Sequence, residues 1–154
     1  MVYERDGVRV TAFDVDHIKP SLGYRVDYRG HSVVLSGDTR FNKNLIHYAD
    51  GTDVLIHEVM AVPPESLAQS EARRNAMNHH TSPEDAGRVF AATGTRLAVY
   101  NHVIVAYADA QQGMSELIRR TRTTYDGALE VGSDLTKIEV SAAPRILARG
   151  PSRK

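Results

Sequence analysis

The segment that most constrains this chain is residues 33–40, where three apolar residues run directly into the turn Ser-Gly-Asp-Thr. Such a run predicts a buried strand that ends in a tight loop and presents Asp38 at its carboxyl end. In open α/β sheets, ligands and catalytic groups gather at that edge. Aspartate is also a common turn residue, so this segment alone is equally compatible with a structural role and with a functional one.

The segments around it predict a mixed α/β domain. Residues 8–15 have the alternating pattern of a strand, and residues 23–35 have that of a hairpin whose two-residue turn is Arg29-Gly30. Three capped helix patterns follow, at 42–50, 83–93 and 110–123. The short and almost wholly apolar run at 53–58 is typical of a parallel strand that is buried on both faces, and residues 96–100 predict another strand.

The remaining segments are less regular. Residues 61–78 contain two prolines and many polar side chains, so we expect a long loop there, with one helical turn at 64–75. Residues 128–131 and 135–140 have the pattern of a final pair of strands.

The composition limits the classes of function. The 154 residues carry 19 basic and 19 acidic side chains, so no overall positive field attracts nucleic acid. Residues 141–154 hold four basic residues and no acidic one, and we expect them to form a disordered tail after a folded domain at 1–140. There is no cysteine, so any metal must be held by carboxylates and the seven histidines. No membrane-spanning run or signal peptide is present, so we expect a cytoplasmic protein without membrane contact.

Four chemically suitable side chains fall where a predicted strand meets the next element: Asp38, Glu58, His80 and His102. If the strands are parallel neighbours, these four groups meet on one rim. Carboxylate and imidazole without thiolate form the ligand set of catalytic zinc, iron or manganese, and the two oxygens of Asp38 can bridge two metals. Glu58 and His80 can form a proton-donating pair in which the carboxylate orients the imidazole.

Each of these residues also has a structural interpretation, because a lone histidine is more often a hydrogen-bonded structural residue than a ligand. We place His31 and His47 in that structural class. The role of His17 stays open, and His79 is either a participant or only the neighbour of His80. Four separate strand ends with suitable groups nevertheless favour a common site.

Four motifs in this order resemble the second half of the metallo-β-lactamase fold, and most closely its ribonuclease Z-like hydrolases: 36–40 (Ser-Gly-Asp-Thr-Arg), 53–58 (Asp-Val-Leu-Ile-His-Glu), 80–82 (His-Thr-Ser) and 100–102 (Tyr-Asn-His). Residues 17–25 are similar to the segment that precedes the family's aspartate strand. The resemblance covers about residues 8–140. It implies the C-terminal half of an αββα sandwich and a divalent metal, with zinc as the expected ion and two ions in the complete fold.

The resemblance also implies roles for the four residues. Asp38 would be the metal-bridging carboxylate and His102 the last ligand, while Glu58 and His80 would assist proton transfer to the leaving group. The family's His-x-His-x-Asp-His motif and its third-region histidine have no match in this sequence. We therefore expect part of a metal-dependent phosphodiester or ester hydrolase, with RNA as a candidate substrate, whose N-terminal metal-binding half is missing. Such a chain would bind metal weakly and have little activity alone.

A second hypothesis is a non-catalytic remnant or a self-associating interaction module that keeps the half-fold without the chemistry. Half of a sandwich leaves one sheet face uncovered, and exposed apolar surface drives association. The expected partner is then either the missing half of the fold or another copy of the chain.

Overall fold

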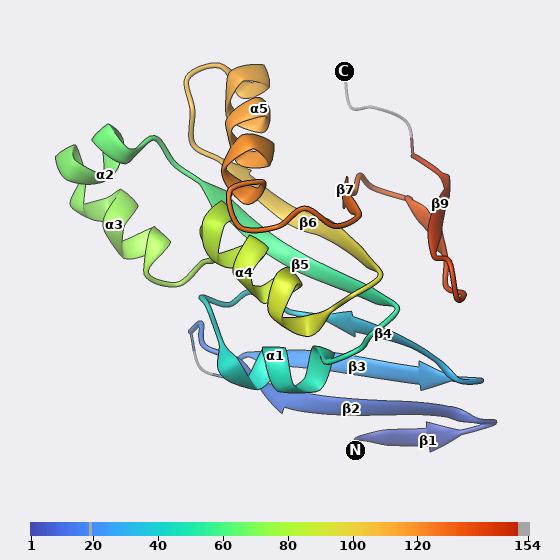
Figure 1. Ribbon diagram of the computed structural model, residues 1–154. Coiled ribbons are helices and arrows are strands. Elements are labelled where there is room, and N and C mark those ends of the chain that lie inside the picture. The colour runs from blue at the N-terminus through green and yellow to red at the C-terminus, as the bar shows by residue number, and fades with distance from the viewer. Residues whose placement is uncertain (19, 151–154) are drawn as a thin grey trace.

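The computed structural model describes residues 1–18 and 20–150, and its main element is a seven-stranded mixed sheet (Figure 1). In sheet order the strands are β1 (Tyr3–Arg5), β2 (Val8–Asp14), β3 (Leu22–Tyr28), β4 (His31–Leu35), β5 (Val54–Ala61), β6 (Leu97–Val105) and β7 (Leu129–Val131). Strands β1 to β4 pair antiparallel, and β4 to β7 pair parallel. The mixed sheet confirms the α/β prediction, the 23–35 hairpin, the parallel strand at 53–58 and the strand at 96–100.

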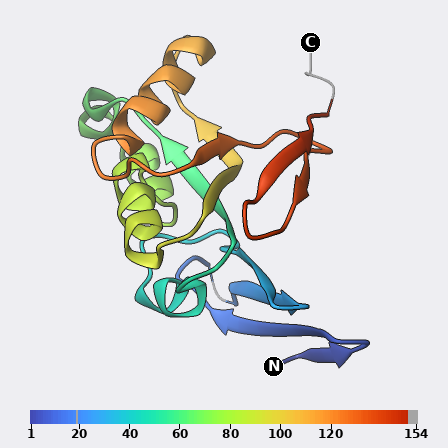
Figure 2. The same cartoon turned by 45° about the vertical axis from the view of Figure 1, so that its right-hand side comes forward.

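The helices α1 (Lys43–Ala49), α4 (Pro83–Thr93) and α5 (Ala110–Thr121) cover one face of this sheet (Figures 1 and 2). The two short helices α2 (Pro64–Gln69) and α3 (Glu71–Met77) lie to one side of it. Side-chain caps begin the three helices that the sequence predicts, because Asn42, Ser82 and Asp109 each accept a hydrogen bond from a first-turn backbone N–H. Among the described residues, no helix combines the length and the apolar character that a membrane span requires.

The prediction for residues 61–78 is wrong in one respect. Two short helices, α2 and α3, occupy the segment in place of a loop with one helical turn, and Ser70 caps the second of them. Neither helix buries a side chain. The polar composition suggested a loop, but the Ser70 cap and the Arg74 guanidinium, which donates to the carbonyls of Leu67 and Ala68, stabilise local helical turns.

The carboxyl-terminal segment also differs from expectation. Strand β7 joins the main sheet beside β6, whereas β8 (Lys137–Glu139) pairs with β9 (Arg145–Ala148) in a separate antiparallel ribbon. The expected pairing of 128–131 with 135–140 is therefore wrong, and the expected disorder does not hold for β9. Ile146 lies opposite Ile138, and Arg149 donates to the Val131 carbonyl at 2.9 Å. Residues 151–154 lie outside the described part of the chain.

The core lies between the sheet and the helices. Its fully buried side chains include Leu45, Leu55, Phe90, Tyr100 and Leu117, and burial of each apolar side chain of this kind contributes about 1.5–3 kcal/mol. This layer fixes β4, β5 and β6 against α1, α4 and α5, and so it determines where their carboxyl ends meet.

The opposite sheet face is largely uncovered. Along β3, Arg25 faces the helices because its guanidinium donates to the Tyr48 carbonyl of α1 at 2.8 Å. Since side chains alternate along a strand, Tyr24 and Tyr28 face the other side, where they are 39% and 40% exposed. The β8–β9 ribbon stands on this side (Figure 2), and Ile138 packs there against a small cluster around Val99.

Candidate metal and proton-transfer site

The structure brings the four predicted side chains together on one rim. Asp38 lies in the loop after β4, Glu58 and His102 lie within β5 and β6, and His80 precedes α4. His102 Nδ1 lies 3.5 Å from Asp38 Oδ1, and His80 Nδ1 lies 3.2 Å from Glu58 Oε2. The rings of His80 and His102 are nearly parallel, with centroids 5.8 Å apart. The chemical roles of the four residues stay predictions.

Glu58 and His102 face each other at an irregularity in the parallel ladder. His57 pairs with Tyr100 and Val59 pairs with Val103, so one residue of β5 opposes two residues of β6. His102 adopts φ of +41°, which is uncommon for a residue other than glycine. Such bulges redirect side chains beside functional sites. The apolar runs predict strands that end at Glu58 and Tyr100, but both strands continue, to Ala61 and Val105.

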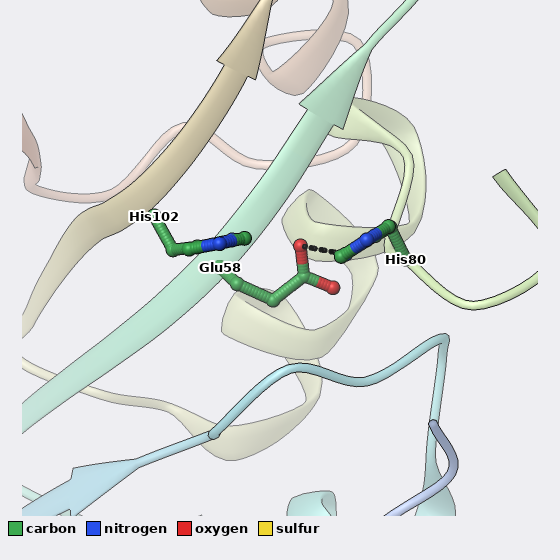
Figure 3. A group of neighbouring side chains, drawn as sticks. All are labelled: Glu58, His80 and His102. Carbon is green, nitrogen blue, oxygen red and sulfur yellow. Dashed lines mark hydrogen bonds and ion pairs between the residues drawn. The ribbon is translucent and has the colours of Figure 1, made fainter. Parts of the chain in front are cut away.

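The Glu58 carboxyl group links three segments of the rim. It is 1% exposed, and its Oε1 accepts hydrogen bonds from the backbone N–H groups of Thr81 at 2.8 Å and Thr39 at 3.3 Å. Its Oε2 faces His80, as the dashed line in Figure 3 shows. Burial raises the pKa of Glu58 to about 8, against the opposing effect of the two backbone N–H groups. The carboxyl group therefore carries a proton near neutral pH.

The His80 imidazole is held in its neutral form. Burial lowers the pKa of His80, and the nearby His17 and His102 act in the same direction while Asp38 opposes them. The ring also lies just before the amino end of α4, where the helix dipole disfavours positive charge. A neutral imidazole beside a protonated carboxyl can pass one proton across the 3.2 Å contact.

His17, whose role the sequence left open, also lies at this rim. Its Nδ1 is 2.8 Å from the His79 carbonyl oxygen, and its ring centroid is 5.0 Å from that of His80. A carbonyl can only accept, so Nδ1 of His17 carries the proton and donates it. His79 is tied to His17 through its backbone. The two histidines classed as structural lie away from the rim, since His31 contacts Asp53 at 3.3 Å and His47 contacts the Tyr48 ring.

His57, which was not among the residues predicted for the site, is fully buried behind the rim. Its Nδ1 donates to the Glu58 carbonyl at 2.6 Å, and its Nε2 has no hydrogen-bond partner among the described residues. Burial lowers the pKa of His57 to about 4, so the ring is neutral at ordinary pH. The available signal was a polar residue in the middle of an otherwise apolar buried run.

A hollow of about 490 Å³ adjoins the rim on the uncovered side of the sheet. Its walls include Ile56, Val99 and His102 from the sheet and the turn at Ser133 before β8. The hollow therefore opens beside the half-exposed His102 ring, where a bound molecule would meet one of the candidate metal ligands.

Known proteins match this chain over most of its length. Residues 2–103 match the family model described as the beta-lactamase superfamily domain. A ribonuclease Z from Mycobacterium avium (strain 104) is 31% identical over 143 residues, which are 92% of this chain and 50% of the relative. A putative ribonuclease Z from Mycobacterium tuberculosis (strain CDC 1551 / Oshkosh) is 29% identical over 140 residues, which are 90% of this chain and 62% of the relative. The chain thus spans about half the length of most of these curated relatives.

Solved structures show the same partial match. The metallo-β-lactamase fold protein YhfI from Bacillus subtilis aligns with a TM-score of 0.66 at 17% identity, covering 85% of this chain and 49% of that protein. The short form of human tRNase Z aligns with a TM-score of 0.58 at 17% identity, covering 94% and 45%. The fold is therefore about half of a metallo-β-lactamase domain, and the chain belongs to the beta-lactamase superfamily.

Proposed function

We propose that this chain contributes the C-terminal part of a metal-dependent hydrolase that cleaves phosphodiesters, with RNA as the candidate substrate. The observation that carries the proposal is that Asp38 and His102, which would bind the metal, lie on one rim beside Glu58 and His80, which would carry the proton. The similarity to proteins named ribonuclease Z supports the choice of phosphodiester over other esters.

Asp38 and His102 fit a divalent metal by their chemistry and their spacing. Two ligands with bonds of about 2.0–2.1 Å at a tetrahedral metal lie roughly 3.3 Å apart. Asp38 Oδ1 and His102 Nδ1 are 3.5 Å apart, which needs only a small adjustment. We infer zinc because carboxylate and imidazole without thiolate suit it. Bound there, the metal would lower the pKa of a bound water to about 7 and so supply a hydroxide nucleophile.

This pair of ligands is too small to hold a catalytic metal alone, because such zinc sites have three protein ligands. The remaining ligands must come from another polypeptide segment. The uncovered sheet face supports that requirement, since Tyr24 and Tyr28 are still about 40% exposed there. We infer that this face packs against the rest of a sandwich, which either the missing half of the fold or a second copy of the chain supplies.

The Glu58–His80 pair would complete the reaction by donating a proton to the leaving oxygen. Glu58 holds a proton near neutral pH, and its Oε2 contacts the imidazole that would deliver it. The backbone N–H groups of Thr39 and Thr81 keep the carboxyl oriented. General acid catalysis of this kind typically contributes about 10²- to 10⁴-fold in rate.

The test is turnover of bis-p-nitrophenyl phosphate and of a 3′-extended tRNA, with added zinc or manganese. The chain is assayed alone and together with the N-terminal half of the M. avium relative, and metal content is measured on the same samples. We expect little turnover by the chain alone, strong metal-dependent turnover by the pair, and loss of that turnover in Asp38→Ala. Equal activity of Asp38→Ala and the unaltered chain in the pair would refute the proposal.

The alternative function is a non-catalytic, self-associating module, which the same uncovered face favours. Sedimentation velocity across a concentration series distinguishes the two functions when it is combined with the assay above. The non-catalytic module would be supported if the chain associates with itself, takes up no metal, and shows no turnover when it is mixed with the N-terminal half of the relative.

A further inference from the structure

We propose that this chain by itself binds one divalent cation through Glu58, His80 and His102. This ligand set includes Glu58 and His80, the pair proposed to carry the proton, and it does not include Asp38. One ligand atom from each of the three side chains lies within 4.8 Å of the other two. Figure 3 shows the Glu58 carboxyl group between the two imidazole rings. Cation binding at this set does not depend on the proposed hydrolase activity.

The contact between Glu58 and His80 already has the separation of a ligand pair. Oε2 and Nδ1 are 3.2 Å apart, against the roughly 3.3 Å expected for two ligands of one tetrahedral zinc ion. A cation bound between these two atoms in place of a proton keeps both side chains close to their present positions, so the site is largely preformed.

His102 completes a three-residue set from the neighbouring strand. Its ring is nearly parallel to that of His80, with an interplanar angle of 21°, and the bulge in β6 directs it to the same rim. Two imidazoles and one carboxylate are the ligands of well-known catalytic zinc sites, in which water occupies the fourth position. The His102 side chain is 49% exposed, which leaves room for that water.

Burial favours this set over the Asp38–His102 pair. The Glu58 side chain is 1% exposed and has no guanidinium or ammonium partner among the described contacts, so a cation would neutralise a carboxylate that water cannot reach. The Asp38 side chain is 38% exposed, and water screens its attraction for a cation. Within this chain, a cation can bind either the three-ligand set that contains the buried Glu58 carboxylate or the two-ligand pair that contains the hydrated Asp38 carboxylate. Burial and ligand number both favour the first.

The two arrangements exclude each other because both use His102. When further ligands complete the metal site at Asp38, the cation moves there and releases Glu58 and His80. This second step rests on the proposed function. In the isolated chain, by contrast, the bound cation occupies the pair that would donate the proton.

The experiment titrates ZnCl₂ into the purified chain by isothermal calorimetry, and Co²⁺ then replaces zinc so that visible absorption reports a four-coordinate site. We expect one equivalent to bind. Glu58→Gln and His80→Gln should each weaken the affinity by at least about tenfold, since removing even a supporting group costs about that much. Asp38→Asn should weaken the affinity by less than about threefold, because Asp38 contacts the His102 ring but supplies no ligand, and its exposed charge is screened by solvent.

His79→Gln is the matched control, because His79 is the exposed neighbour of His80 and its side chain lies outside the ligand set. Zinc should also shift the ring ¹⁵N resonances of His80 and His102 and leave those of His31 unchanged, a measurement that remains decisive if Glu58→Gln unfolds. Loss of binding in Asp38→Asn but not in His80→Gln would place the ion at Asp38 and overturn this inference while favouring the proposed hydrolase site. Absence of saturable binding would overturn the inference and leave the assay of the paired halves unaffected.

Discussion

Glu58 and His102 lie opposite each other across a bulge between two parallel strands, where one residue of β5 faces two residues of β6. The extra residue allows both side chains to reach the rim in the middle of a continuous ladder. A regular ladder would keep strict alternation between the two faces. The irregularity therefore brings Glu58 and His102 to the rim, while the strand pairing on either side of it stays regular.

Deletion of Asn101 tests this relationship. The deletion removes the extra residue, so β6 can pair regularly from Tyr100 to Val103 and the strained φ of His102 is relieved. We expect the helices to persist in the circular dichroism spectrum, while zinc affinity falls by about tenfold or more because His102 is redirected. Replacement of Asn101 by Ala is the control, since it keeps the residue count. Unchanged zinc affinity in the deletion would show that the bulge does not position His102.

The buried His57 predicts acid sensitivity. The pKa of His57 is about 4 in the folded chain and about 6.5 in the unfolded chain, so between these pH values the unfolded chain binds a proton that the folded chain does not. The free energy of unfolding is then unaffected above pH 6.5 and falls as pH decreases toward 4, by up to about 3 kcal/mol.

Urea unfolding at pH 7 and pH 4.5 checks this effect. In His57→Leu the difference in unfolding free energy between the two pH values should shrink by about 2–3 kcal/mol, because the group that titrates is gone. His47→Gln removes a histidine that is not buried and should keep the full difference. If His57→Leu also kept the full difference in unfolding free energy between the two pH values, the acid sensitivity would have to come from other groups.

Arg120 connects α5 to two other segments. Its guanidinium contacts both oxygens of Glu84 in α4, at 2.7 and 2.9 Å, and donates to the Val62 carbonyl at 2.9 Å. We expect Arg120→Ala to lower the free energy of unfolding by about 2 kcal/mol, because a largely buried bidentate pair and a carbonyl lose their partner. Arg119→Ala removes the exposed neighbour, which pairs with Glu116 within the same helix, and should leave stability unchanged. Equal effects in thermal unfolding of the two variants would contradict the assignment.

The uncovered sheet face predicts where association occurs. Tyr24→Arg should weaken self-association, or binding of the complementing half, by about tenfold or more, because a charge then has to be buried in an apolar contact. Phe41→Arg is a matched control, since Phe41 is 38% exposed against 39% for Tyr24 but lies in the loop before α1. Sedimentation velocity gives the comparison. Equal weakening by both substitutions would mean that the sheet face is not the contact surface.

Much of the fold and the placement of the site could be predicted from local patterns. Asp38 follows an apolar strand and a glycine turn, and His80 precedes a capped helix, so each is marked by its own neighbours in the sequence. The bulge could not be predicted, because register depends on how two strands pair and not on either strand alone. The polar residues at the bulge interrupt an apolar run, which made β5 and β6 look shorter than they are.

His57 and β9 were missed for a related reason. A histidine beside Glu58 looks like part of the rim, and only the tertiary packing shows that its ring turns toward Phe90, with centroids 5.8 Å apart. The scattered arginines of the last segment suggested disorder, but Ile146 finds a partner in Ile138. Long-range contacts decide both cases.

Relatives of this chain can diverge in the segment between Met60 and Thr81, which contains α2 and α3. The two ends of this segment are already held together, because the Met60 N–H donates to the Thr81 carbonyl at 2.9 Å. The helices between them bury no side chain, so lengthening or replacing them adds only a slowly growing loop-closure entropy and removes no core contact. This segment begins shortly after Glu58 and ends just before His80, and new recognition surfaces can therefore evolve beside the rim at little cost in folding.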